Sequence, residues 1–351
     1  MSQFKKLIVK EIKTETADTV SISFEIPSEL KPEFNYQAGQ YITIKKEVDG
    51  EEIRRSYSLS SSPLENDFRI GVKKIANGKM SSFLNEQLKV GDLLEVLPPL
   101  GNFKINDLSS CSVGFAAGSG ITPLLSMVKS VLKSNGKFIL FYSNKTSNGV
   151  IFKNELETLR NQFPNHFALH YIYSKENIGN TLLEGRINKE KANLLIKENI
   201  AFEKADGFYL CGPEEMVKNI ADALKELGVV ESKIHFELFV APQIKNETNQ
   251  KTESDFFGES HVTVLMDGDE FEFNLKADGN SVLDAAIEAG ADAPFSCKGA
   301  VCCTCKAKVI EGKVTMKLNY SLSDAEVKEG YVLTCQSHPA SEKVVVDYDV
   351  T

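Results

Sequence analysis

Five of the chain's seven cysteines lie near its C-terminal end, four of them in the stretch SCKGAVCCTCKAK. Cys297, Cys302 and Cys305 are separated by four and then by two residues, and Cys335 follows further along. This is the spacing of plant-type proteins that hold a [2Fe–2S] cluster, in which four thiolates converge on two irons. We therefore predict that these four cysteines bind such a cluster. Cys303 fits none of the four ligand positions and is expected to be a small loop residue beside it.

Zinc and a Rieske-type centre are the alternatives for this stretch. A structural zinc site usually combines two short Cys-x2–4-Cys units, whereas only Cys302 and Cys305 form one here. Cys335 and His338 have the spacing of half a Rieske motif, but no Cys-x-His occurs anywhere in the chain to supply the other half. Ligation by four cysteines is therefore the favoured interpretation, and it implies a low reduction potential.

A glycine-rich turn, GFAAGSGITP, follows an apolar run and precedes a helical pattern. Gly118 and Gly120 would let the backbone approach a pyrophosphate, which would face the helix N-terminus. Thr122 is expected to cap that helix. Pro123 stands where a Rossmann fingerprint has its third glycine, which suggests a nicotinamide-binding family other than the usual dehydrogenases. The plainer alternative is a packing turn in an α/β sheet.

These motifs lie in a chain that divides into several parts. Residues 1–104 hold short strand-like runs between Gly, Pro and Asn turns, which predicts an antiparallel β-barrel. Residues 105–242 alternate strands with helices, which predicts a doubly wound parallel sheet. Residues 243–258 are mostly polar and read as a linker. Residues 259–351 combine strand runs with one helix and are expected to form a small α+β module.

Charge separates the last module from the rest of the chain. The 351 residues carry a net charge of −9. From Glu259 onward sixteen acidic residues face eight lysines, so this module holds −8 of it. An acidic surface suits a basic protein partner, although it also serves solubility alone. No basic patch indicates nucleic-acid binding. No apolar run is long enough for a membrane span or signal peptide, so the expected location is the cytoplasm.

Four motifs in the order RRSYS, GKMSSFL, GSGITP and CGP resemble the ferredoxin–NADP reductase family, here with a plant-type ferredoxin domain of β-grasp fold at the C-terminus. The resemblance covers nearly the whole chain and implies FAD, NADPH and a [2Fe–2S] cluster as cofactors. The tail NYSLSDAEVKEGYVLTCQSHP is most similar to reductases that serve an epoxidase of phenylacetyl-CoA.

The resemblance assigns roles around the flavin. Arg55 would pair with the FAD pyrophosphate, Tyr57 would stack on the isoalloxazine ring, and Ser58 would hydrogen-bond its N5. Phe239 would cover the other face of the ring. The main chain at the start of a helix would hold the diphosphate through Gly78, Ser81 and Ser82. Taken singly, each of these has a plainer reading as a barrel or core residue.

The resemblance also places the nicotinamide. Cys211 would lie beside it and act with Ser58 in catalysis. The other expected contacts are Gly118, Gly120, Thr122, Pro123, Lys145, Gly212 and Pro213. No acidic residue follows the strand KFILFYS, which ends in Asn144, Lys145 and Thr146. An acid there would favour NAD and a base the 2′-phosphate of NADP, so NADPH is expected rather than NADH.

The implied activity is a relay from NADPH through FAD and the cluster to a multi-subunit oxygenase, docked through the acidic ferredoxin domain. The phenylacetyl-CoA 1,2-epoxidase is the expected acceptor. Other members of the family serve other oxygenases, hydroxylases or hybrid-cluster proteins, which stay open as alternatives. A flavin and iron–sulfur redox sensor without turnover is the alternative from another class.

Overall fold

The computed structural model describes residues 4–199, 204–240 and 256–350. The described residues fall into two compact units. Of these, the larger holds residues 4–99, 103–199 and 204–239, and the smaller holds residues 100–102, 240 and 256–350. Most of the predicted linker, residues 243–258, lies outside the described residues. The boundaries expected at residues 104 and 242 stay predictions.

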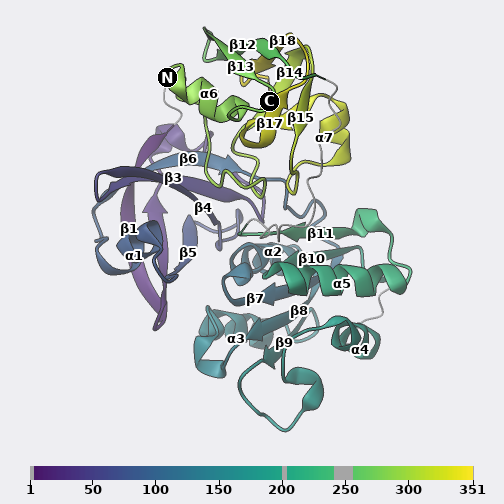
Figure 1. Ribbon diagram of the computed structural model, residues 1–351. Coiled ribbons are helices and arrows are strands. Elements are labelled where there is room, and N and C mark those ends of the chain that lie inside the picture. Colours follow the sequence, from purple (N-terminus) through teal and green to yellow (C-terminus); the bar gives the residue numbers. More distant parts are fainter. Residues whose placement is uncertain (1–3, 200–203, 241–255, 351) are drawn as a thin grey trace. The chain divides into compact units, whose positions relative to one another are not determined.

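The first sheet of the larger unit is antiparallel and curled (Figure 1). Its strands are β1 (Lys5–Thr16), β2 (Thr19–Glu25), β3 (Tyr41–Val48), β4 (Glu51–Ser58), β5 (Arg69–Lys73) and β6 (Leu93–Leu100). Their order is β4-β3-β6-β1-β2-β5, so β4 and β5 are the two outer strands. A bridge between Leu59 and Ile70 joins these ends and closes the curl. The predicted antiparallel barrel is thereby confirmed, and its apolar side chains fill the inside.

The second sheet of this unit is parallel, as predicted. Its strands are β7 (Cys111–Ala117), β8 (Lys137–Asn144), β9 (Phe167–Tyr173), β10 (Gly207–Cys211) and β11 (Ile234–Glu237). The order β11-β10-β7-β8-β9 shows that the chain runs outward in one direction from β7 and then returns to β10 on its other side. Ligands of such sheets bind where the order reverses, at the carboxyl ends of the strands. That point lies between β7 and β10.

Helices α1 (Lys79–Glu86), α2 (Ile121–Lys133), α3 (Lys153–Gln162), α4 (Lys189–Asn199) and α5 (Glu214–Glu226) connect these strands. Short 3-10 turns are η1 (Ser28–Leu30), η2 (Gly118–Gly120), η3 (Ser147–Gly149), η4 (Thr181–Leu183) and η6 (Glu231–Lys233). The prediction that Thr122 caps α2 is wrong, because η2 winds directly into the helix and Gly120 takes the cap position. No helix in the described parts of the chain is long and apolar enough to cross a membrane.

The smaller unit is the predicted α+β module. Its main sheet has the order β13-β12-β18-β14-β16 and contains β12 (Glu259–Met266), β13 (Asp269–Lys276), β14 (Lys306–Glu311), β16 (Tyr331–Leu333) and β18 (Lys343–Asp347). A two-stranded ribbon pairs β15 (Val314–Met316) with β17 (Ser337–Pro339). The helices are α6 (Val282–Glu288), α7 (Asp324–Lys328) and the 3-10 turn η7 (Thr334–Gln336). The buried face of α6 packs into the same core as the cysteine loop.

Candidate redox sites

The four predicted ligand cysteines form two pairs in the smaller unit. The Sγ atoms of Cys297 and Cys302 lie 3.1 Å apart. Cys305, which precedes β14, pairs with Cys335 in η7 through a second thiol hydrogen bond. The bond from Cys302 lowers the pKa of Cys297 to about 6, and the bond from Cys305 lowers the pKa of Cys335. The same bonds, together with burial, raise the pKa of Cys302 and Cys305 well above the usual value. Each pair therefore contains one thiol that favours the thiolate, the form that binds metal.

The loop backbone turns its N–H groups toward these sulfurs. Lys298 and Ala300 both have left-handed backbones, with φ of 49° and 63°, which residues other than glycine seldom adopt. Between them the N–H of Gly299 donates to Cys297 Sγ at 3.3 Å. The N–H of Ala300 bonds Cys335 in the same way. Strained backbone of this kind persists where the surrounding structure fixes it, and it can turn successive N–H groups toward an anionic group.

The arrangement fits a two-iron cluster. In such a cluster each iron takes two cysteine thiolates, and the loop offers two pairs. Among the residues that the structure describes, no three His, Cys, Asp or Glu side chains converge as the ligands of one ion would. Cys303 belongs to neither pair, and its side chain packs against the module's core instead. The assignment of Cys297, Cys302, Cys305 and Cys335 as ligands stays a proposal that this geometry supports.

The expected flavin residues lie along β4 and at the start of α1, both in the larger unit. Arg55 is exposed, Tyr57 is half-buried and Ser58 is buried. Burial raises the pKa of Tyr57, so its hydroxyl stays protonated. The Arg55 guanidinium donates to the neighbouring Arg54 carbonyl at 2.7 Å. The guanidinium of Arg55 and the buried hydroxyl of Ser58 lie on one strand, which suits a ligand that combines an anionic group with a ring system.

The start of α1 offers backbone donors to an anion. Gly78 takes the N-cap position, and no side chain caps the helix there. The N–H groups of its first turn therefore point outward without an intrahelical partner, as an anion site requires. Ser81 donates its hydroxyl to the Gly78 carbonyl at 3.1 Å. The N–H of Ser82 also donates to Gly78, at 2.9 Å, and so belongs to the helix rather than to the anion site.

The expected nicotinamide residues meet at the strand reversal between β7 and β10. Cys211 ends β10 and pairs with Ala116 of β7. A Cβ atom at Gly120 would lie 2.1 Å from the Cys211 carbonyl oxygen, so only glycine permits this approach. The two motifs, far apart in sequence, are thus in direct contact. The remaining expected residues lie around this point or at the same carboxyl edge: Gly118 in η2, Thr122 and Pro123 in the first turn of α2, Gly212 and Pro213 before α5, and Lys145 after β8.

Sequence reasoning missed Glu237, which links the two halves of this site. It ends β11 next to Cys211, and Ser58 Oγ of β4 donates to its Oε2 at 3.4 Å. Burial raises the pKa of Glu237 to about 8, against the effect of the Ser58 bond. Burial and Glu237 raise the pKa of Cys211 well above its usual value, so that thiol stays neutral. The signal available in the sequence was an acidic residue at the end of a strand, at the edge of the sheet where the other motifs also end. Phe239, two residues further on, is 43% exposed.

These groups predict a pH step that depends on Glu237. Below about pH 8 the protonated carboxyl leaves the Ser58 hydroxyl free to donate to a ligand, whereas the carboxylate draws that hydroxyl to itself. Flavin reduction should therefore slow as pH rises through about 8, and Glu237→Gln should flatten the profile. Burial lowers the pKa of His235 and, together with Glu237, raises the pKa of Cys211 well above its usual value, so neither group adds a step near pH 8. Stopped-flow reduction between pH 6 and 10 measures it.

Stability supplies the second readout for this prediction. The folded pKa of Glu237 lies above its ordinary 4.5, so its contribution to stability is complete below pH 4.5 and is lost as pH rises through about 8. Glu237→Gln should therefore gain in Tm relative to the natural chain between pH 6 and pH 9. An unchanged Tm difference across that range would contradict the raised pKa.

Comparison with protein families finds three matches along the chain. Residues 6–105 match the oxidoreductase FAD-binding domain family, and residues 115–222 match the oxidoreductase NAD-binding domain family. Residues 264–340 match the 2Fe-2S iron-sulfur cluster binding domain family. The order of the three matches is that of the two sheets and the cysteine module.

Whole-length relatives share this order. The chain is 40% identical to one of the subunits of the 1,2-phenylacetyl-CoA epoxidase of Escherichia coli K12, over 99% of both chains. It is 31% identical to the ferredoxin reductase component of the 3-ketosteroid-9-alpha-monooxygenase of Rhodococcus rhodochrous, over 97% of this chain and 96% of that one. The structure of phthalate dioxygenase reductase has the same fold, with a TM-score of 0.61 and 24% identity over 98% of both chains.

Proposed function

Since the chain belongs to the reductase components of oxygenases that combine FAD-binding, NAD-binding and 2Fe-2S domains, we propose that it takes electrons from NADPH and delivers them to a phenylacetyl-CoA epoxidase. The chain is an NAD(P)H-dependent oxidoreductase that transfers electrons to an oxygenase. The observation that carries the choice of epoxidase is the 40% identity, end to end, with a subunit of that enzyme.

Different groups of the chain's residues serve the different cofactors. When bound, the flavin and the cluster convert a two-electron donor into single-electron deliveries. Arg55 and the first turn of α1 bind the diphosphate, and Tyr57 covers the ring. Ser58 and Glu237 hold a proton beside the reacting position. The two cysteine pairs hold the irons, and buried, neutral Cys211 shapes the nicotinamide side without acting as a nucleophile.

The preference for NADPH rests on two lysines at the carboxyl edge of the parallel sheet. Lys145 follows β8 and Lys175 follows β9, and the N–H of Lys175 donates to the Lys145 carbonyl at 2.9 Å. Both side chains are exposed, and neither forms an ion pair within the described residues. The nearby acid Glu176 is occupied by the N–H and hydroxyl of Ser147, at 2.6 and 3.0 Å. Two adjacent cations suit a 2′-phosphate.

Removing both charges should therefore weaken the binding of NADPH and leave the binding of NADH unchanged. The double variant Lys145→Ala, Lys175→Ala should raise the KM for NADPH about tenfold or more, because charge-assisted hydrogen bonds contribute roughly 1.5–3 kcal/mol. The KM for NADH should stay unchanged. Lys137→Ala is the matched control, since this exposed lysine begins β8 at the opposite end of the strand. An equal rise in KM for both nucleotides would show that the lysines do not recognise the 2′-phosphate.

The acceptor is tested by reconstitution. The purified reductase, loaded with FAD and cluster, is mixed with the oxygenase subunits of a phenylacetyl-CoA epoxidase, and NADPH consumption is followed together with epoxide formation. A 3-ketosteroid monooxygenase serves as the non-cognate acceptor. Docking through the acidic module predicts that coupled turnover falls with rising salt, whereas ferricyanide reduction does not. Turnover with ferricyanide and none with the epoxidase would overturn the acceptor assignment, and very slow turnover with both would favour a sensor.

A further inference from the structure

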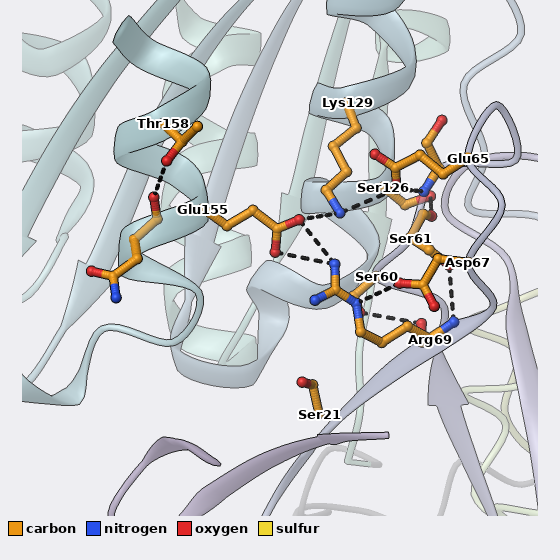
Figure 2. A network of polar contacts seen from close by, with 12 residues as sticks. Ser21, Ser60, Ser61, Glu65, Asp67, Arg69, Ser126, Lys129, Glu155 and Thr158 are labelled. Carbon is orange, nitrogen blue, oxygen red and sulfur yellow. Dashed lines mark hydrogen bonds and ion pairs between the residues drawn. The ribbon is translucent and has the colours of Figure 1, made fainter. Parts of the chain in front are cut away.

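Helix α2 is buried on every side. All its residues from Ile121 to Leu132 are shielded from solvent, although the helix carries a lysine and several hydroxyls. Leu124, Val128 and Val131 pack into the core of the parallel sheet. Ser126, Lys129 and Ser130, spaced three and four residues apart, form a polar stripe on one face. This stripe faces the antiparallel barrel, and Figure 2 shows its Ser126 and Lys129 together with their partners.

Ion pairs cross between the barrel and the parallel-sheet module in both directions. Lys129 Nζ, on α2, lies 3.3 Å from Glu65 of the barrel module. Arg69 Nη2, on β5 of the barrel, lies 2.9 and 3.2 Å from the two oxygens of Glu155 on α3. Glu155 also contacts Lys129, which places one carboxylate between the two cations (Figure 2). The side chain of Lys129 is only 2% exposed, so its charge depends on these partners.

Buried hydroxyls extend this contact along the stripe. Ser126 donates to the carbonyl of Ser61 at 2.5 Å. The hydroxyls of Ser62 and Ser130 lie 2.7 Å apart. All four serines are fully buried. Because buried polar groups are costly to leave unpaired, these bonds fix the two surfaces in one register, whereas an apolar contact could slide.

A tight apolar contact defines the other end of the joint. A Cβ atom at Gly71 of β5 would meet Thr122 Cγ2 at 2.8 Å and the ring of Phe152 at 3.0 Å. Phe152, which precedes α3, has a left-handed backbone with φ of 58°, an uncommon conformation for a bulky residue. The Arg69 guanidinium lies over the same ring, 5.6 Å from its centre. Strand β5 thus contacts the parallel-sheet module through both Arg69 and Gly71.

This joint is continuous with the redox site on both sides. Ser58, whose hydroxyl reaches Glu237, precedes Ser61 and Ser62 by only a few residues on the same segment. Gly120, which presses on the Cys211 carbonyl, immediately precedes α2. We propose that Lys129 is a positioning residue: with Glu65, Arg69 and Glu155 it sets the spacing between the Ser58 side and the Cys211 side of the site. This inference rests on the proposed function of that site.

The test compares three variants of the full chain in anaerobic stopped-flow experiments. Lys129→Met keeps the length of the side chain and removes its charge. The limiting rate constant for flavin reduction by NADPH should fall about ten- to a hundredfold, because small misplacements cost that much. The Kd for NADPH and the FAD content should stay unchanged, and Lys129→Arg should restore most of the rate. Lys133→Met is the matched control, since Lys133 also lies 3.3 Å from Glu65 but is 41% exposed.

A second readout is independent of the cofactors. In the FAD-free chain, amide hydrogen exchange at Ser60–Ser62 and along α2 should accelerate in Lys129→Met and not in Lys133→Met. If Lys129→Met fails to fold, Glu155→Gln keeps the size of a partly exposed side chain and should show the same loss of rate to a smaller extent. An unchanged limiting rate in the folded variants, or a loss expressed only in Kd, would overturn the inference. Failure of the natural chain to reduce its flavin would instead overturn the proposed function.

Discussion

Replacing Cys302 with serine should remove the [2Fe–2S] cluster, with iron and acid-labile sulfide falling to background. Cys302 is buried, and its Sγ lies 3.1 Å from that of Cys297, so the change would leave one iron with a single thiolate. Serine is close to cysteine in size, so the fold of the module should persist. Electron delivery to the oxygenase should be lost, whereas ferricyanide reduction by NADPH should continue, because the flavin residues lie elsewhere in the chain.

Cys303→Ser is the control for this prediction, one position further along the same loop. Its side chain belongs to neither thiol pair and packs against the core of the smaller unit. This variant should retain full iron and sulfide content and the visible absorption of the cluster. Equal loss of iron from both variants would contradict the ligand assignment, as would full iron content in Cys302→Ser.

Replacing Ser58 with alanine should slow flavin reduction by NADPH about a hundredfold, the usual effect of losing a positioned proton donor. Ser58 is 4% exposed, and its hydroxyl is the group through which Glu237 reaches the barrel side of the site. Alanine leaves the strand intact and removes only this hydroxyl. The limiting rate constant in stopped-flow reduction measures the effect, and the bound FAD per chain shows whether the site still loads.

Ser56→Ala is the matched control, because Ser56 lies two residues earlier on β4 and therefore on the same side of the strand. Its hydroxyl lies 3.0 Å from that of Thr43, within the barrel. The rate constant of this variant should stay within about twofold of the natural chain. Similar losses in both variants would mean that strand stability, and not the Ser58 hydroxyl, governs the rate.

The cysteine and glycine motifs could be predicted from the sequence because their chemistry constrains short stretches of chain. Cys297, Cys302 and Cys305 must be close in sequence for one loop to present them. Likewise Gly120 must lack a side chain for its turn to lie against Cys211 at the end of β10. The other patterns were equally local: strand runs between Gly, Pro and Asn turns predicted the barrel, and alternating strands and helices predicted the parallel sheet. The position of Thr122 within its helix was missed, because the preceding turn starts the helix early.

Glu237 and Lys129 could not be found in this way, because their partners lie far along the chain. Lys129 stands among apolar residues in the pattern SMVKSVLK, where a lysine reads as a solvated helix position. The fold brings its partners to it, Glu65 from 64 residues earlier and Glu155 from a later helix. Glu237 becomes a functional candidate only when the barrel brings Ser58 to it. Contacts between modules leave no periodic trace in either segment.

The outer strand β13 of the cysteine module has a consequence for association between copies of this protein. As the end strand of its sheet it presents backbone groups to which a further strand could add. Asp269, Glu270 and Glu272 are exposed along it, while Phe271 and Phe273 alternate inward. Like charges on an open edge repel a second copy in the same register. Part of the module's negative charge therefore disfavours edge-to-edge aggregation, whichever oxygenase the protein serves.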